Sequence, residues 1–330
     1  MEHNGQIHHS NSYLISIALF TIFIAIITVY FLSETFRTNR ALKNIKVYTD
    51  YLTLTSLDPK KLSNYKLGDF YISSSFNTAC VGYQMFDYVS LEMISAKLKT
   101  GARFLHFQVF NSAYNAGSVP VISSGYRTGE WKLTPNQITF EDACQLIAYD
   151  AFTLNKNEGG VFNPNDPLII CLDLKTNNQL STLNKMYKII KKHWSKRLIN
   201  PKYSFAKRNV AEIPMIELMG KIIIIASNGY QGSDLEEFVN MNYEDRVVYT
   251  NTDAKTILTE IHTKKETPEL IMVFPHHEGD IQTVNYDPQI CWDEGAHCVC
   301  MNFQTPDEYM DDYITKFRNS SFILKSPHLR

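Results

Sequence analysis

Few side chains in this chain of 330 residues have the chemistry to act as catalysts or metal ligands. Four candidates lie in or beside apolar, strand-like runs. They are the imidazole of His106, the carboxylate of Asp173, and the side-chain amides of Asn77 and Gln108. Such nitrogen and oxygen donors can ligate a transition metal. A single inward-facing histidine is more often simply hydrogen-bonded, so we expect no bound metal.

A run of cations without an intervening acid is a second candidate site. Its central part could bind anionic lipid headgroups, since each cation near a membrane surface contributes about 1 kcal/mol. A solvated helix exterior is the alternative interpretation. Nucleic acid is not expected as a partner, because the formal charge of the whole chain is −2. The residues of this basic patch are Lys188, Lys191, Lys192, Lys196 and Arg197.

Residues 13–33 predict a transmembrane helix. The stretch from Tyr13 to Ser33 has no charged residue, and at about 1.5 Å per residue it crosses a hydrocarbon core of about 30 Å. A signal peptide would have a basic start and a shorter apolar core, whereas this chain opens with Met1, Glu2 and His3. Cations follow the span, which places the large domain of this single-pass protein on the cytosolic side, or on the matrix side of a mitochondrial membrane.

Apolar runs alternate with amphipathic segments in the rest of the chain, a pattern typical of a parallel α/β sheet. The amphipathic segments are 90–99, 140–154, 179–198, 254–264 and 306–317. The six cysteines form no CxxC pair or zinc spacing, which favours buried thiols in a reducing compartment.

Short motifs in this part of the chain follow a recognisable order. Residues 71–78 read YISSSFNT, residues 101–108 GARFLHFQ, and residues 285–289 NYDPQ. Further motifs lie at 120–126, 167–173, 213–224, 302–305 and 322–325. In sequence and order they resemble the X and Y catalytic regions of phosphoinositide-specific phospholipase C.

The resemblance implies a distorted (β/α)₈ TIM-type barrel, an α/β fold whose functional end is the carboxyl edge of the strands. We expect it to follow one N-terminal transmembrane helix. The expected divisions are a tail (1–12), the transmembrane helix (13–33), a stalk (34–68), an X-like half-barrel (69–227), a connector (228–268) and a Y-like half-barrel (269–330).

The same resemblance shows which residues stand at the family's catalytic positions. Members cleave a phosphodiester through attack by the inositol 2-hydroxyl, with two histidines moving protons and a calcium ion stabilising charge. Phe76 and Ser124 occupy the two histidine positions. Neither side chain can exchange protons near neutral pH.

The calcium and phosphate positions are altered as well. Asn77, His106, Gln108 and Asp173 stand at the calcium positions and carry one formal negative charge. The positions that contact substrate phosphates read Ile225, Ser227, Met272 and Phe274. We therefore expect neither calcium nor another cofactor.

The sequence therefore predicts a membrane-anchored pseudoenzyme that binds protein partners as a scaffold or accessory subunit of a membrane assembly. One alternative is an active phosphodiesterase that uses His106, His276 or His277 for proton transfer and Asp173 on a different metal. Another is a regulator that binds phosphoinositides without cleaving them.

Overall fold

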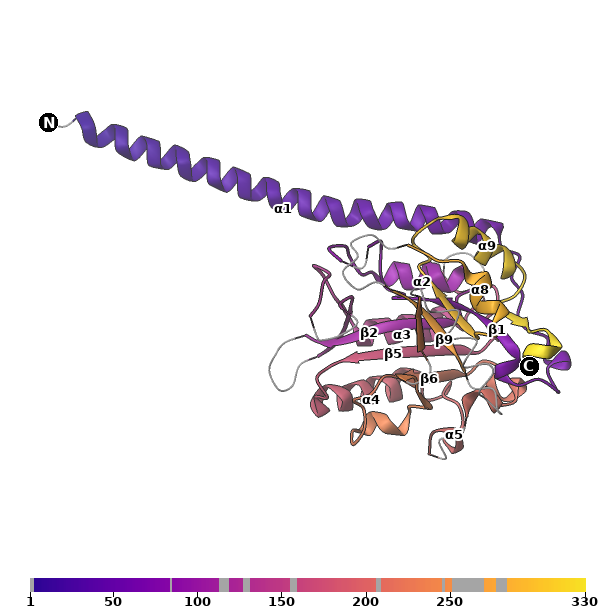
Figure 1. The fold of residues 1–330 in the computed structure, drawn as a ribbon. Helices are drawn as coiled ribbons and strands as arrows, with labels where there is room; N and C mark the ends of the chain where they lie inside the picture. The colour runs from indigo at the N-terminus through magenta and orange to yellow at the C-terminus, as the bar shows by residue number, and fades with distance from the viewer. Residues whose placement is uncertain are drawn as a thin grey trace.

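The computed structural model describes residues 3–83, 85–112, 119–126, 131–154, 159–205, 209–244, 247–250, 270–276 and 284–330. A mixed α/β domain carries one long N-terminal helix that projects away from it (Figure 1). The helices are α1 (His3–Tyr51), α2 (Leu91–Lys99), α3 (Phe140–Asp150), α4 (Leu180–Trp194), α5 (Lys202–Phe205), α6 (Met215–Leu218), α8 (Pro288–Asp293) and α9 (Glu308–Lys316).

The strands form one curled sheet. They are β1 (Phe70–Ser75), β2 (Phe104–Asn111), β3 (Pro120–Ser123), β4 (Ile138–Thr139), β5 (Leu168–Lys175), β6 (Ile222–Ala226), β7 (Met241–Asn242), β8 (Val247–Thr250), β9 (Met272–Pro275), β10 (Cys298–Met301) and β11 (Phe322–Leu324).

The main path of the sheet runs β7-β6-β5-β2-β1-β10-β9-β8, and every neighbouring pair on it is parallel. Helices α2, α3 and α4 lie outside the strands (Figure 1). The described residues form no pair between β7 and β8, so the barrel is open at that seam. The predicted α/β barrel is confirmed.

The motif at 120–126, which resembles the family's third strand, does not continue the parallel order. Its strand β3 pairs antiparallel with β2, placing Gln108 opposite Ser123, and β4 pairs antiparallel with β3. Strands β2, β3 and β4 thus form an antiparallel meander at this side of the parallel sheet.

Burial divides the strand residues into two apolar layers. On β5, Ile169 and Cys171 pack inside the barrel, whereas Ile170 and Leu172 pack toward the helices. This alternation follows from the two-residue period of a strand. Both faces of the parallel strands are covered, which is why their sequences are almost continuously apolar.

Helices α2, α3, α4 and α9 form where amphipathic segments predicted them, and the expected segment 254–264 lies outside the described residues. Several begin at a side-chain cap. Ser90 accepts a hydrogen bond from the backbone N–H of Met93, and Asp307 accepts one from that of Met310. Such caps satisfy amide groups that have no partner within the helix.

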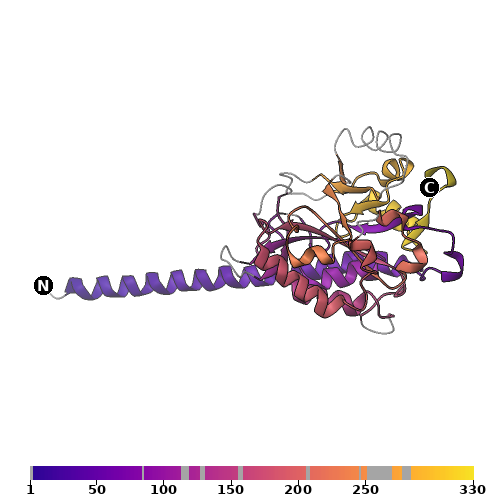
Figure 2. The same ribbon diagram turned by 90° about the horizontal axis from the view of Figure 1, so that it is seen from below.

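The first helix is longer than the predicted span. It begins at His3, within the expected tail, and continues through the first half of the expected stalk to Tyr51. Seen from below, its N-terminus and the C-terminus of the chain lie at opposite ends of the molecule (Figure 2). A continuous helix thus connects the apolar stretch directly to the barrel.

The expected connector, 228–268, also contributes to the barrel. Its described part contains β7 and β8, which pair with β6 and β9 respectively. The expected connector therefore extends each half of the sheet by one strand.

Candidate functional site

Four residues singled out from the sequence meet at the carboxyl edge of the strands. Phe76 directly follows β1, His106 and Gln108 lie on β2, and Asp173 lies on β5. The register of β2 and β5 places Gln108 opposite Asp173. Parallel strands end at one edge, so the fold alone brings these residues together.

Aromatic rings fill the centre of this edge. The Phe76 ring stacks on the His106 imidazole, with centroids 4.6 Å apart and planes 13° apart. The Phe274 ring lies 5.3 Å from Phe76 and 4.8 Å from His106. All three residues are at most 2% exposed. We call Phe76, His106 and Phe274 the aromatic plug.

The polar atoms around the plug bond to one another. Nδ1 of His106 lies 2.9 Å from Oδ1 of Asn77. The backbone N–H of Asn77 also donates toward the same Nδ1, at 3.3 Å. The Asn77 side-chain amide donates to Oγ of Ser124 at 3.4 Å. Asn77 has a φ of 34°, a left-handed conformation that asparagine tolerates better than most residues. This turn fixes the orientation of the imidazole.

Asp173 is held by a second set of contacts. Its carboxylate accepts a hydrogen bond from Nε2 of Gln108 at 3.1 Å and lies 3.3 Å from Nζ of Lys175. Oε1 of Gln108 in turn accepts the backbone N–H of Gly125 at 2.7 Å. Burial raises the pKa of the Asp173 carboxyl, and Lys175, Gln108 and Tyr243 oppose that rise.

These residues do not fit a calcium ion, which takes about six to eight oxygen ligands. Oδ1 of Asn77 is directed at His106, and the Asp173 carboxylate already has the Lys175 ammonium beside it. Among the described residues, no three His, Cys, Asp or Glu side chains are grouped closely enough to hold a metal.

The positions expected to contact substrate phosphates have structural roles. Ile225, Met272 and Phe274 are at most 1% exposed and pack in the barrel interior. Oγ of Ser227 accepts the backbone N–H of Leu174 at 2.8 Å. None of these four side chains carries the positive charge that phosphate recognition uses.

Sequence reasoning missed two members of the site. Lys175 lies two residues after Asp173, so the two-residue period of a strand puts both side chains on one face. That spacing could have revealed Lys175 as a neighbour of Asp173. Tyr243, whose ring lies 5.9 Å from the Phe274 ring, comes from the expected connector, and nothing in the neighbouring sequence marked it as a site residue.

The two histidines that the sequence offered as alternative proton carriers are His276 and His277. The backbone N–H of His276 donates to Oγ1 of Thr250 at 2.8 Å, and His277 lies outside the described residues.

The basic patch lies at the carboxyl end of α4 and in the turn after it. Its five residues are exposed, but several have local partners. Lys192 pairs with Glu141 at 2.6 Å, and the Arg197 guanidinium lies 4.6 Å from the centre of the Phe152 ring. Such contacts reduce the charge available to a lipid surface.

The fold agrees with comparisons to known proteins. The family model described as "Phosphatidylinositol-specific phospholipase C, X domain" matches residues 63–228, and the corresponding Y domain model matches residues 224–328. The chain therefore belongs to the phosphatidylinositol-specific phospholipase C family. A search of curated proteins finds no match.

Solved structures show the same fold. The crystal structure of L. pealei PLC21 is 20% identical with a TM-score of 0.65, and that of S. officinalis PLC21 is 18% identical with a TM-score of 0.61. Each comparison covers 83% of this chain and 39% of the other chain. At this identity the likeness concerns the barrel alone, since fold and chemistry separate readily.

Proposed function

We propose that this protein is a membrane-anchored, phospholipase C-like pseudoenzyme that serves as a scaffold or accessory subunit of a membrane assembly. The observation that carries the proposal is the aromatic plug. Phe76 packs on His106 and Phe274 at the position where family members place a proton-carrying histidine. The three rings of the plug contact one another, and each of these residues is at most 2% exposed.

The chemistry of the site supports the same proposal. A positioned acid or base typically contributes about 10²- to 10⁴-fold to a rate, and Phe76 and Ser124 supply neither at the two histidine positions. His106 is stacked and bonded to Asn77, and Asp173 is paired with Lys175. Binding, rather than turnover, is the use that this arrangement leaves to the barrel.

The anchor is the apolar part of α1. The helix has an apolar window with a mean hydropathy of 2.6, long enough to cross a membrane, and none of that window is buried against the domain. An exposed apolar helix of this length is stabilised by lipid rather than by water. We propose that it crosses the bilayer once, with the barrel on the cytosolic or matrix side.

A turnover assay tests the pseudoenzyme proposal. Full-length protein in vesicles containing phosphatidylinositol 4,5-bisphosphate, with millimolar calcium, should release no inositol phosphate above the rate of protein-free vesicles. Release that His106→Ala or Asp173→Asn abolishes would overturn the proposal. It would favour the alternative of an active phosphodiesterase with altered chemistry.

The scaffold role requires protein partners. Cross-linking of the full-length protein in its native membrane, followed by mass spectrometry, should recover the same neighbours repeatedly through lysines of the barrel. Recovery of α1 contacts only, with none from the barrel, would contradict a scaffolding barrel. A second proposal is that the basic patch binds anionic lipid headgroups. Lys188→Ala combined with Lys196→Ala should then weaken binding of the full-length protein in micelles to added phosphatidylserine vesicles, and unchanged binding would contradict it.

A further inference from the structure

We propose that a cavity on the outer face of the barrel binds a small organic acid, that is, a compact apolar body that carries one carboxylate. The cavity lies between α4, α5 and the chain that follows the 3₁₀ turn Asp234–Glu237, and its volume is about 490 Å³. Cavities of about 300–1,000 Å³ are typical of small-molecule sites. Such a ligand is separate from anything that the carboxyl edge of the strands would bind.

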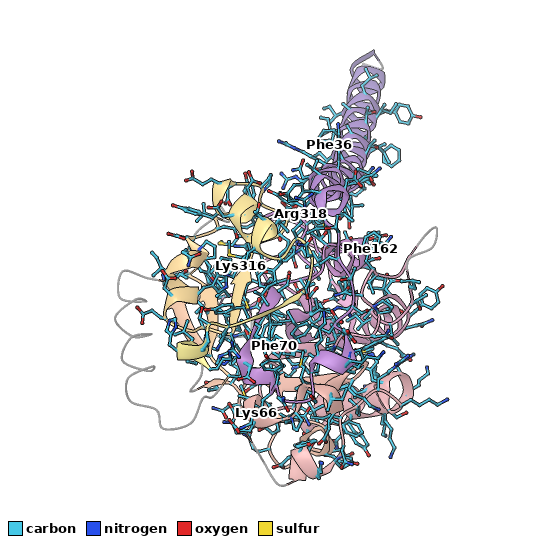
Figure 3. The ribbon with its side chains drawn as sticks, turned by 90° about the vertical axis from the view of Figure 1, so that its right-hand side faces the viewer. Phe36, Lys66, Phe70, Phe162, Lys316 and Arg318 are labelled. Atoms are coloured by element: carbon cyan, nitrogen blue, oxygen red, sulfur yellow. The ribbon has the colours of Figure 1, made fainter. Side chains whose placement is uncertain are left out.

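The cavity is remote from the aromatic plug. Figure 1 shows α4 and α5 on the side of the strands away from α1, and Figure 3 shows the same part of the ribbon at the opposite end of the domain from α1. Lys221, which lines the cavity, directly precedes β6. The cavity therefore lies near the amino end of that strand, and no residue of the aromatic plug lines it.

Hydrogen bonds to β6 hold two sides of the cavity in place. The chain after α4 bonds to the start of the strand, where the backbone N–H of Ile199 donates to the carbonyl of Ile222 at 3.3 Å. On another side, the backbone N–H of Asn240 donates to the carbonyl of Ile224 at 2.8 Å. Oδ1 of Asn240 also accepts the backbone N–H of Ile224 at 2.8 Å. The cavity is therefore formed by the fold itself.

Apolar side chains make up much of the lining. Ile199 and Tyr203 are each 5% exposed, and Leu198 and Phe238 are partly buried. The Phe238 ring stacks on the ring of Tyr187 from α4, with centroids 4.7 Å apart. Burial of a compact apolar or aromatic body against these side chains is favourable.

Two buried polar side chains in the lining have hydrogens left to donate. Ser204 and Asn240 are only 7% and 6% exposed. The side-chain amide of Asn240 donates one hydrogen to Oγ of Ser204 at 2.7 Å. Among the described residues, neither the hydroxyl hydrogen of Ser204 nor the second amide hydrogen of Asn240 has an acceptor. Because a buried donor without an acceptor is costly, an oxygen atom of a ligand is favoured here.

The two acids of the lining already have cations beside them. Glu217 accepts hydrogen bonds from the Tyr203 hydroxyl at 2.6 Å and from Nζ of Lys202 at 3.1 Å. These two bonds lower the pKa of the Glu217 carboxyl, so it is ionised at neutral pH. Glu237 interacts electrostatically with Lys191, which also lines the cavity. Neither acid therefore needs a cationic ligand.

Lys221 is the cation that a ligand would pair with. Its ammonium has no ion pair or hydrogen bond within the part of the chain that the structure describes, and its side chain lines the cavity. A carboxylate at this ammonium would form a charge-assisted hydrogen bond. A ligand with several negative charges would be repelled by Glu217 and Glu237, which are exposed at the rim. The lining therefore favours a single carboxylate.

Equilibrium dialysis with 4-hydroxyphenylacetate tests the site, because this compound combines a carboxylate, an aromatic body and a hydroxyl oxygen. Full-length protein in micelles is compared with protein-free micelles. We expect saturable binding with a dissociation constant of about 1 mM or lower. Neutral 4-hydroxyphenylacetamide should bind at least about 10-fold more weakly. No saturable binding, or equal binding of the acid and the amide, would overturn the proposal.

Three substitutions locate the binding. Lys221→Met should weaken binding of the acid by about 10- to 100-fold, since a charge-assisted hydrogen bond is lost. Ser195→Trp, at an exposed position of the lining, should block the cavity. The matched control Lys196→Met removes an exposed cation that does not line the cavity, and it should leave binding unchanged.

The variants decide the outcome as follows. Binding that survives undiminished in Lys221→Met or in Ser195→Trp would overturn the proposal. Equal weakening in Lys196→Met would overturn it as well, because binding would then follow the charge of the basic patch. Thermal unfolding checks that each variant is folded, and if Lys221→Met does not fold, Ser195→Trp decides.

Discussion

At the scale of single residues, packed rings dominate the carboxyl edge of the barrel. By resemblance to the family, Phe76 stands at a histidine position and Phe274 at a substrate-contact position. The His106 imidazole stacks on Phe76 and meets Phe274 edge-on. Offset or edge contacts between such rings contribute about 0.5–1.5 kcal/mol beyond the burial of their area. These ring contacts thus stabilise the carboxyl edge of the barrel.

Removing the Phe76 ring tests this role. Phe76→Ala should lower the free energy of unfolding by about 3–5 kcal/mol, because a buried ring is lost and a cavity remains. Chemical unfolding of the full-length protein in detergent micelles measures the change. Phe36→Ala, at an exposed position of α1, should stay within about 0.5 kcal/mol. Equal effects of the two substitutions would show that the plug is not a packing unit.

Asp173 makes the stability of the site depend on pH. Burial raises the pKa of this carboxyl above its usual value of 3.8, so the folded state holds the proton where the unfolded state has lost it. Its contribution to stability is therefore largest at low pH and falls as the pH rises from about 4 through the raised pKa.

Asp173→Asn removes that dependence. The unfolding free energy of the variant minus that of the natural protein should grow as the pH rises and then level off above the folded-state pKa. Urea unfolding at a series of pH values measures the difference. A difference that shrinks with rising pH would mean that Lys175 holds the carboxylate ionised in the folded state.

Much of the residue-level site could be predicted from the sequence. Asn77, His106, Gln108 and Asp173 could be placed because motif order and strand direction locate them at one edge. The contacts between them could not, because the sequence does not show that Phe76 lies flat on His106 or that Lys175 pairs with Asp173. Side-chain packing depends on neighbours far apart in the chain.

At the scale of elements, α1 also packs against the barrel. Beyond the apolar stretch, Ala41, Ile45 and Tyr48 are buried, and the first two pack with Val81 and Met93 beside α2. The sequence predicted a mixed, polar stalk here that packs on the flank of the barrel. It did not show which residues make the contact, because charged residues are interspersed among the apolar positions.

Because α1 packs on the barrel, substitutions at two nearby positions of this helix should change the free energy of unfolding by different amounts. Ile45 is 1% exposed and Val47 is 66% exposed. Ile45→Ala should cost about 2–5 kcal/mol of unfolding free energy, and Val47→Ala should change it by less than about 0.5 kcal/mol. Thermal or denaturant unfolding in micelles compares them. Similar small effects would mean that α1 does not pack on the barrel.

Strand and helix order could largely be read from the sequence, since buried parallel strands and amphipathic helices have different periods. The antiparallel direction of β3 could not. A short apolar run has the same composition whether it pairs parallel or antiparallel, and only its partner strand decides. The strands β7 and β8 were missed because each is short and lies in a polar stretch.

At the scale of the whole molecule, one long helix projects from a barrel whose carboxyl edge is packed with the protein's own side chains (Figure 1). The barrel has the fold of the phospholipase C family. This arrangement supports the proposal of a membrane-attached domain that binds partners through its outer surface.

Ligand-dependent stabilisation is the most direct test of the filled edge. A ligand at about 100 times its dissociation constant stabilises a folded protein by about 2.7 kcal/mol. The melting temperature of the full-length protein in micelles is measured with and without millimolar calcium and inositol trisphosphate. We predict no shift. A rise that requires both ligands and disappears in Asp173→Asn would show that the carboxyl edge still opens to a headgroup.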